Sequence, residues 1–179
     1  MSDLVDTVRA LASKKAEVED PRELFLDIAE RIIRSASGEF GVKLDEVAIL
    51  MLTTDQRHLR FVTPRKFVDL GMIPLNKHDS IAVAVFGKRR GEANNNVPTI
   101  KHVAFFESVK IRDRVVPIQK MITVPILYKD SAVGIAQISR KGETAAQAGA
   151  DFTDADVKRA EALFREVAPY LWQARPDRF

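Results

Sequence analysis

Residue types that commonly carry out chemistry are sparse in this sequence. It contains no cysteine and three histidines, so it has no thiolate that could attack a substrate, form a disulfide or hold zinc. His58, His78 and His102 share no spacing typical of metal ligands, and we expect each of them at the surface or in a turn. The sequence therefore predicts no metal site and gives no sign of a cofactor.

Two motifs associated with catalysis are also missing. Residues 87–91 (GKRRG) place glycines around a lysine, but without the spacing of a phosphate-binding loop. No Gly-x-Ser-x-Gly sequence occurs, so there is no nucleophile elbow of the α/β-hydrolase type. We therefore expect a protein that is not an enzyme.

Charge is distributed unevenly along the chain. Residues 1–40 carry nine acidic and six basic side chains, whereas residues 55–120 carry thirteen basic and six acidic ones. A basic stretch suits an anionic ligand or partner, although such runs are more often simply a solvated surface. Nucleic acid is a poor match, because the stretch lacks interleaved aromatic residues and any known reader motif.

Composition describes a soluble protein with one core. The 179 residues are 46% hydrophobic and 30% charged, which is typical of a single globular domain. No apolar run approaches the roughly 18 residues of a membrane span. The start of the chain is neither basic nor followed by an apolar signal core, so we expect a cytoplasmic protein.

Helices are expected at both ends of the sequence. An apolar stripe of Leu4, Val8, Leu11 and Val18 predicts an amphipathic helix over residues 3–18. A second helix is expected to start at Pro21 behind an Asp20 cap and to end near 35–37, before Gly38 and Gly41. Two short helices are expected over 81–86, ended by Gly87, and over 101–109. A final helix is expected over 153–172, capped by Thr153 and kinked or ended at Pro169.

Two β-hairpins are expected between these helices. Residues 46–54 and 59–63 form the first, and residues 121–128 and 132–139 form the second, with Pro125 at a sheet edge or bulge. Residues 91–97, with three consecutive asparagines, are expected to form a turn. Tight connections between strands imply an antiparallel sheet with helices on its faces, which is an α+β fold.

Short motifs accompany these elements in a characteristic order. They are residues 73–75 (IPL) with 79–82 (DSIA) and 91–92 (GE), then residues 122–126 (ITVPI) with 133–138 (VGIAQI), and finally residues 152–156 (FTDAD) leading into the last helix.

The ordered set resembles the GAF domain, a ligand-sensing module of signalling proteins, over roughly residues 22–172.

In the cyclic-nucleotide-binding members of that family an Asn-Lys pair is followed by a Phe and an Asp-Glu pair. Here Arg140-Lys141 precede Phe152, and Asp156 is followed by Val157, so the asparagine and the glutamate are absent. A cyclic nucleotide is therefore an unsupported ligand, and we expect Lys141 and Asp156 to form a structural ion pair. Members that work as sulfoxide reductases or attach a bilin do so through cysteine, which this chain lacks.

The resemblance implies a regulatory domain over residues 21–179 that binds a small, anionic molecule between the sheet and the short helices and acts on a separate signalling protein. Residues 1–20 precede that domain, and we expect their apolar stripe to form a homodimer through the terminal helices or to fold back on the sheet. A dimerisation or protein-interaction module without a working pocket is the alternative function. The expected ligand-binding residues are Phe86, Arg89, Arg90, Asn94, Asn95, Asn96, Phe105, Phe106, Thr123 and Gln137, although the phenylalanines are equally compatible with an ordinary core.

Overall fold

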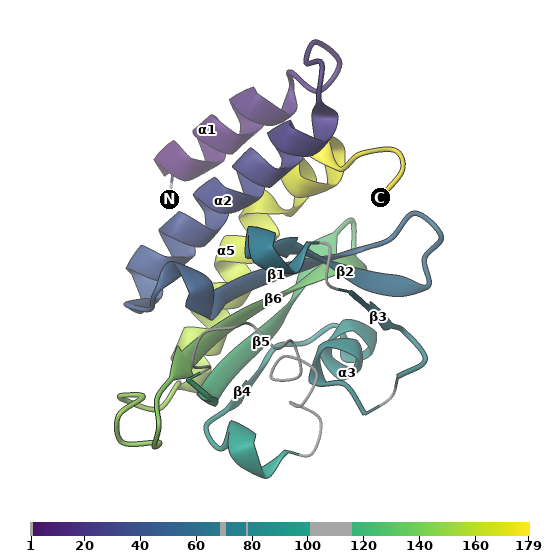
Figure 1. The fold of residues 1–179 in the computed structure, drawn as a ribbon. Helices are drawn as coiled ribbons and strands as arrows, with labels where there is room; N and C mark the ends of the chain where they lie inside the picture. Colours follow the sequence, from purple (N-terminus) through teal and green to yellow (C-terminus); the bar gives the residue numbers. More distant parts are fainter. Residues whose placement is uncertain (1, 69–70, 78, 101–115) are drawn as a thin grey trace.

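Helices at the two ends of the chain enclose six strands in the computed structural model, which describes residues 2–68, 71–77, 79–100 and 116–179 (Figure 1). The α-helices are α1 (Ser2–Ala12), α2 (Pro21–Phe40), α3 (Ile81–Lys88) and α5 (Asp154–Ala174); the strands are β1 (Val47–Leu52), β2 (His58–Thr63), β3 (Met72–Pro74), β4 (Glu92–Asn94), β5 (Ile118–Tyr128) and β6 (Ser131–Lys141); and the short 3-10 turns are η1 (Leu44–Glu46), η2 (Arg65–Phe67) and η3 (Val97–Thr99).

The strands form one antiparallel sheet in the order β3-β2-β1-β6-β5-β4. Strands β1, β2 and β3 are neighbours in both sequence and space, and so are β4, β5 and β6. The two groups meet in the centre, where Ile49 lies opposite Ala136. This arrangement confirms the predicted α+β class and both predicted hairpins.

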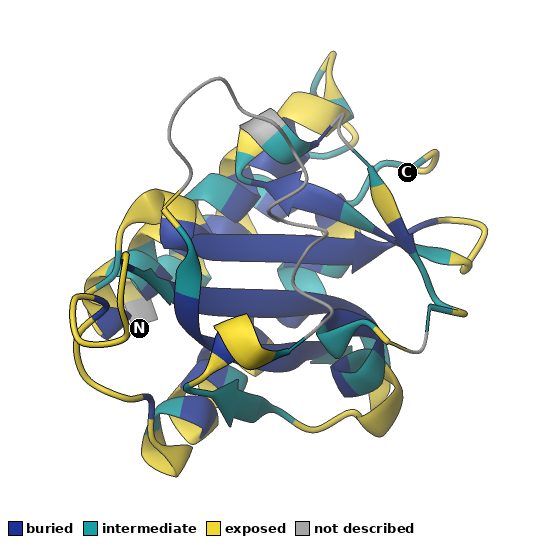
Figure 2. Cartoon of the chain, turned by 60° about the horizontal axis from the view of Figure 1, so that its bottom comes forward, coloured by how far each residue is buried: buried dark blue, intermediate teal, exposed yellow. Residues whose placement is uncertain are grey.

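The two faces of the sheet have different covers. Helices α2 and α5 pack on one face and, together with α1, form the larger apolar cluster, which includes Phe25, Ile49 and Phe164. On the opposite face α3 packs over β5 and β6 (Figure 1). Figure 2 looks onto that second face and shows the central strands coloured as buried.

Helix α1 is shorter than predicted and packs on its own chain. It ends at Ala12 rather than near residue 18, and it contacts α2 and α5 rather than the sheet. Val8 and Ala12 are fully buried there, and Nε of Arg9 donates to the Tyr170 hydroxyl at 2.9 Å. This docking gives the apolar stripe a partner within the chain, so the stripe no longer requires a second copy. Dimerisation through the terminal helices stays a prediction.

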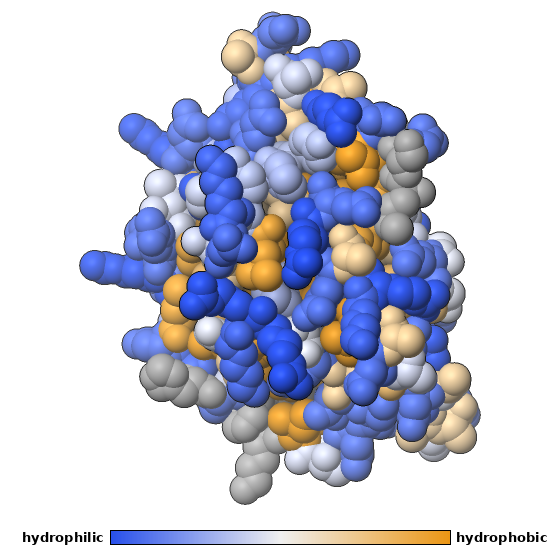
Figure 3. Space-filling model, turned by 180° about the vertical axis from the view of Figure 1, so that it is seen from behind, coloured by the Kyte–Doolittle hydropathy of each residue, from blue (hydrophilic) through white to orange (hydrophobic). Residues whose placement is uncertain are grey.

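The surface at the back of the molecule is relevant to dimerisation. Seen from behind, its surface is predominantly hydrophilic, with apolar side chains in small separate groups (Figure 3). Stable interfaces between copies usually have an apolar centre. The part of this face that is coloured in the figure presents no such continuous surface.

Two helices continue past their predicted ends, and a third continues past a proline that was predicted to kink or end it. Helix α2 runs through Gly38 and ends at Phe40, where Gly41 adopts the left-handed conformation (φ 60°) that closes a helix. Helix α3 continues through Gly87 to Lys88. Helix α5 continues past Pro169 to Ala174, so this proline does not end the helix, and a kink there stays a prediction. Buried residues flank Gly38 and Pro169, so tertiary packing holds the helical conformation at these two positions where local propensity would end it.

Strand β4 lies where a turn was predicted. Its residues Glu92–Asn94 pair with β5 through Ala93 opposite Ile122. The pairing stops at Thr123, so Pro125 lies beyond the end of β4, at a position where β5 has no partner strand on that side among the described residues. Such an edge position is the one predicted for a proline, which has no N–H to donate.

The predicted cap of α5 is confirmed, but the predicted ion pair is wrong. Thr153 Oγ accepts a hydrogen bond from the backbone N–H of Asp156, and the Asp156 carboxylate accepts one from the backbone N–H of Thr153. That second bond is the main reason why the pKa of Asp156 is lowered. Asp156 pairs with Arg159, whereas Lys141 pairs with Asp45 at 2.8 Å. The half-match to cyclic-nucleotide-binding GAF domains therefore has no structural counterpart here.

We expect Thr153→Ala to lower the free energy of unfolding by about 1 kcal/mol, because the first turn of α5 loses its capping acceptor. Chemical denaturation of both proteins at pH 7 measures the difference. Thr153→Ser keeps the hydroxyl and should stay near the wild-type value. Equal losses for Ala and Ser would contradict the capping role.

Candidate functional site

The candidate site is the sheet face beneath α3, where the predicted ligand pocket would lie. Ala82 and Val85 of α3 pack there against Leu50, Phe61 and Ile135 of the sheet. Within the described chain, one helix of eight residues covers this face, whereas three longer helices lie on the other side.

A facing pair of polar side chains, Thr123 and Gln137, is buried within this apolar face. Thr123 of β5 and Gln137 of β6 lie opposite each other in the sheet, and their exposed fractions are 1% and 4%. Residues two apart on a strand share a face, so Gln137 lies on the same side as Ile135, which contacts the α3 cluster. The structure thus brings together two of the predicted site residues.

Within the described residues, the Gln137 amide makes only part of its possible hydrogen bonds. Its Nε2 donates to Thr123 Oγ1 at 3.3 Å, and its Oε1 meets no hydrogen-bond donor among the described residues. Leaving a buried polar atom without a partner costs about 1–3 kcal/mol. Rotating the amide by half a turn exchanges Oε1 and Nε2 but still leaves one of them without a partner.

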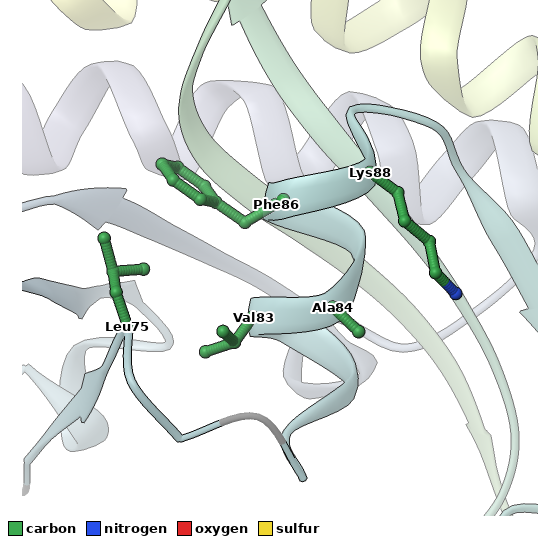
Figure 4. Close-up of a pocket in the computed structure, with 6 residues that line it drawn as sticks. Leu75, Val83, Ala84, Phe86 and Lys88 are labelled. Carbon is green, nitrogen blue, oxygen red and sulfur yellow. The ribbon is translucent and has the colours of Figure 1, made fainter.

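A groove of about 350 Å³ runs along the outer side of α3. Figure 4 shows Leu75, which follows β3, facing Val83 and Phe86 of the helix, with Lys88 on the flank of α3 farther from Leu75. Phe86 is thus the predicted site residue that reaches this groove. The lining residues are Leu75, Val83, Ala84, Phe86, Gly87 and Lys88.

The two predicted anion-binding arginines lie at the end of α3. Arg89 closes the helix in the left-handed conformation, with φ 54°. Its guanidinium donates to the carbonyl of Asp130 at 3.2 Å, in the turn between β5 and β6. Arg90 is exposed. Neither residue is among those lining the groove, so anion binding by these side chains stays a prediction.

The three asparagines make structural contacts. Asn95 Nδ2 donates to the carbonyl of Phe152, and Asn95 Oδ1 accepts from the N–H of the same residue, at 3.0 and 2.9 Å. Asn94 Oδ1 accepts from the backbone N–H of Asn96 at 3.0 Å. Asn95 thereby connects the end of β4 to the start of α5. A role of these asparagines as a lid over a ligand stays a prediction.

Several predicted positions fall outside the described residues, namely Phe105, Phe106, His78 and His102, together with the short helix expected over 101–109. His58, the first residue of β2, has its Nδ1 3.7 Å from Oδ2 of Asp55. In the described part of the chain, no group of three histidine, cysteine, aspartate or glutamate side chains is placed to hold a metal ion.

Sequence reasoning missed most of the groove. Leu75, Val83, Ala84, Gly87 and Lys88 were not among the expected site residues. One signal could have pointed to some of them: residues 81–87 (IAVAVFG) are apolar around the whole circumference of a helix that is only eight residues long. A helix apolar on every side leaves apolar side chains on its outer flank unless something else covers it.

Membrane insertion finds no support in the helices. Within the residues that the structure describes, none of them combines the length and the apolar character that a membrane crossing requires.

Comparisons with known proteins connect this chain to one fold. No family model and no curated protein matches its sequence. Among solved structures, the GAF domain of a phosphoenolpyruvate-protein phosphotransferase from Coxiella burnetii matches with a TM-score of 0.65 and 10% identity, covering 96% of this chain and 94% of that one. Residues 122 to 287 of a methyl-accepting chemotaxis protein match with a TM-score of 0.64 and 15% identity, covering 92% and 96%.

An enzyme is also among the similar structures. The type II free methionine-R-sulfoxide reductase from Thermoplasma acidophilum matches with a TM-score of 0.59 and 17% identity, covering 85% of this chain and 95% of that one. The same fold therefore occurs in domains of a chemotaxis protein and a phosphotransferase and in a reductase.

Proposed function

The chain has the fold of GAF domains, and from that premise we propose that it is a non-catalytic regulatory domain that binds a small molecule on the α3 side of its sheet. Domains of a chemotaxis protein and of a phosphotransferase share this fold at nearly full coverage. A fold alone does not establish a function, so the proposal depends on what lies on that face of the sheet.

The side chains available favour binding over catalysis. The chain has no cysteine and therefore no thiolate for a redox cycle or covalent attack. The polar groups of the buried Thr123–Gln137 pair are a hydroxyl and an amide. Neither group exchanges a proton readily near neutral pH, whereas both are common in the recognition of small molecules.

The observation that carries the proposal is the amide of Gln137, whose Oε1 has no hydrogen-bond partner within the described part of the chain. A buried amide left incomplete destabilises the ligand-free protein. A ligand that supplies the missing hydrogen bond removes this cost on binding. Its hydrogen-bonding group would lie against Gln137, and the rest of the molecule would lie against the apolar side chains beneath α3.

We expect the double variant Thr123→Val/Gln137→Met to unfold at the same free energy as the wild type or at a higher one. Both substitutions keep the approximate shape of the side chain, and replacing both partners of a hydrogen bond by apolar groups of similar shape is nearly neutral. The same variant should lose ligand binding. Chemical denaturation measures the first effect, and a thermal-shift panel of nucleotides, amino acids and other metabolites measures the second.

A ligand present at about 100 times its dissociation constant should stabilise the wild type by roughly 2.7 kcal/mol. Mass spectrometry of the native purified protein searches independently for a co-purified molecule. A stabilising compound that acts equally on the double variant would place the site elsewhere. If no compound stabilises the wild type and none co-purifies, the dimerisation or interaction module becomes the better interpretation.

A further inference from the structure

The groove along the outer side of α3 is separate from the Thr123–Gln137 pair, because neither of those residues lines it. We propose that this groove is a second binding site, and that it takes a small amphipathic carboxylate, meaning a short apolar chain or ring that ends in a carboxylate group. The proposal goes beyond the function proposed above and does not depend on it.

The shape of the groove suits an apolar body. Its volume of about 350 Å³ lies at the lower end of the range found for small-molecule sites, roughly 300–1,000 Å³. Leu75 and Phe86, both partly buried, provide its apolar side chains together with Val83 (Figure 4). A ligand that covers these side chains removes apolar surface from water on both partners, which favours binding.

Gly87 keeps part of the groove open. A Cβ atom added at this position would meet no atom within 4 Å, so the backbone of α3 borders open space there. After proline, glycine is the least favourable residue inside a helix, and no close contact at Gly87 requires it. A larger side chain at this position would occupy the space that the ligand needs.

The charge at the groove favours an anionic head group. Of the six lining residues, Lys88 is the ionisable one. Its Nζ lies 3.4 Å from Oε2 of Glu92, and the side chains of Lys88 and Glu92 are 64% and 40% exposed. Ion pairs this exposed are weak, so the ammonium group is available to a carboxylate that lies nearer. The flexible stem of a lysine lets its ammonium group follow such a ligand along the helix, and the neighbouring Arg89 and Arg90 add positive charge.

Three probes that share an eight-carbon chain test this proposal on the full chain. Octanoate carries the carboxylate, octan-1-ol is uncharged and octyltrimethylammonium is cationic. Titration followed by amide chemical shifts should show octanoate binding most tightly, octan-1-ol less tightly and the cation least, with the largest shifts at residues 81–90. Binding of the cation as tightly as octanoate, or shifts centred elsewhere, would overturn the proposal.

Gly87→Leu should weaken octanoate binding about tenfold or more, because the leucine side chain fills the groove. Gly38→Leu is the matched control, since Gly38 is also a helical glycine at which an added Cβ atom would meet nothing within 4 Å, and it should leave binding unchanged. Lys88→Met should weaken octanoate about two- to fivefold, the range expected for one exposed ion pair, without changing the affinity for octan-1-ol.

The two proposed sites are distinguished by one further variant. Thr123→Val/Gln137→Met should bind octanoate as the wild type does, because neither residue lines the groove. If this variant loses octanoate binding, or if Gly87→Leu retains it, the groove is not the site. Either result would leave the test of the proposed function untouched, because that test uses the metabolite panel rather than octanoate.

Discussion

Gly134→Ala is expected to lower the free energy of unfolding by about 3 kcal/mol, at the upper end of what overpacking costs. Gly134 lies in β6 opposite Met51 of β1. A Cβ atom here would lie 2.5 Å from the carbonyl oxygen of Leu50 and 2.7 Å from Sδ of Met51. The Leu50 oxygen belongs to the backbone and cannot rotate away, so the two central strands would have to move apart.

Thermal unfolding monitored by circular dichroism checks this expectation, and a loss of this size corresponds to roughly 6–12 °C in a domain of this length. Gly38→Ala is the control. Gly38 is exposed within α2, and an added Cβ meets nothing there, so alanine should stabilise the protein by about 0.5–1 kcal/mol. The packing explanation fails if both variants move the melting temperature in the same direction.

Glu46→Gln should cost about 2–3 kcal/mol, the second largest effect that we expect. The Glu46 side chain is buried, and its two carboxylate oxygens accept hydrogen bonds from the backbone N–H groups of Lys43 and Lys141, both at 2.7 Å. Glutamine offers one acceptor oxygen, and its amide NH₂ would face the second N–H group. Hydrogen bonds to a charged acceptor contribute about 1.5–3 kcal/mol each.

Urea denaturation of Glu46→Gln alongside Lys141→Met separates the carboxylate from its surroundings. Lys141→Met keeps the backbone N–H that Glu46 binds and removes the ion pair with Asp45, which should cost about 0–1 kcal/mol. A Glu46→Gln variant within about 0.5 kcal/mol of the wild type, the ordinary range of surface substitutions, would contradict this role of the carboxylate.

Features specified by neighbouring residues were predictable from the sequence. Asp20 and Thr153 cap α2 and α5 as expected, because a cap needs only a side-chain oxygen two or three residues before the N–H that it accepts from. The two hairpins followed from runs of β-branched and aliphatic residues on either side of short turns. The order of these elements, together with their short motifs, is enough to indicate the GAF-like fold.

Features that depend on distant segments were not predictable in the same way. The sequence offers several acidic side chains that could pair with Lys141. Its partner is Asp45 because η1 packs against the end of β6. Strand β4 ends with an asparagine, and two more follow it, which favours a turn locally, but pairing with β5 holds the strand extended. Leu75 and the α3 residues become neighbours only when the chain between them folds back.

The docking of α1 has a consequence for the time course of synthesis. Arg9 and its partner Tyr170 are 161 residues apart, and Lys15 Nζ binds the carbonyl of Arg175 and the carboxylate of Asp177 near the other end of the sequence. At translation speeds of about 5–20 residues per second, α1 waits on the order of 10–30 s at the ribosome before α5 emerges. Helix α2 follows α1 closely in the sequence and can pack on it early, whereas the contacts of α1 with α5 form only at the end of that interval. Until then the side chains of α1 that face α5 are exposed to chaperones and proteases.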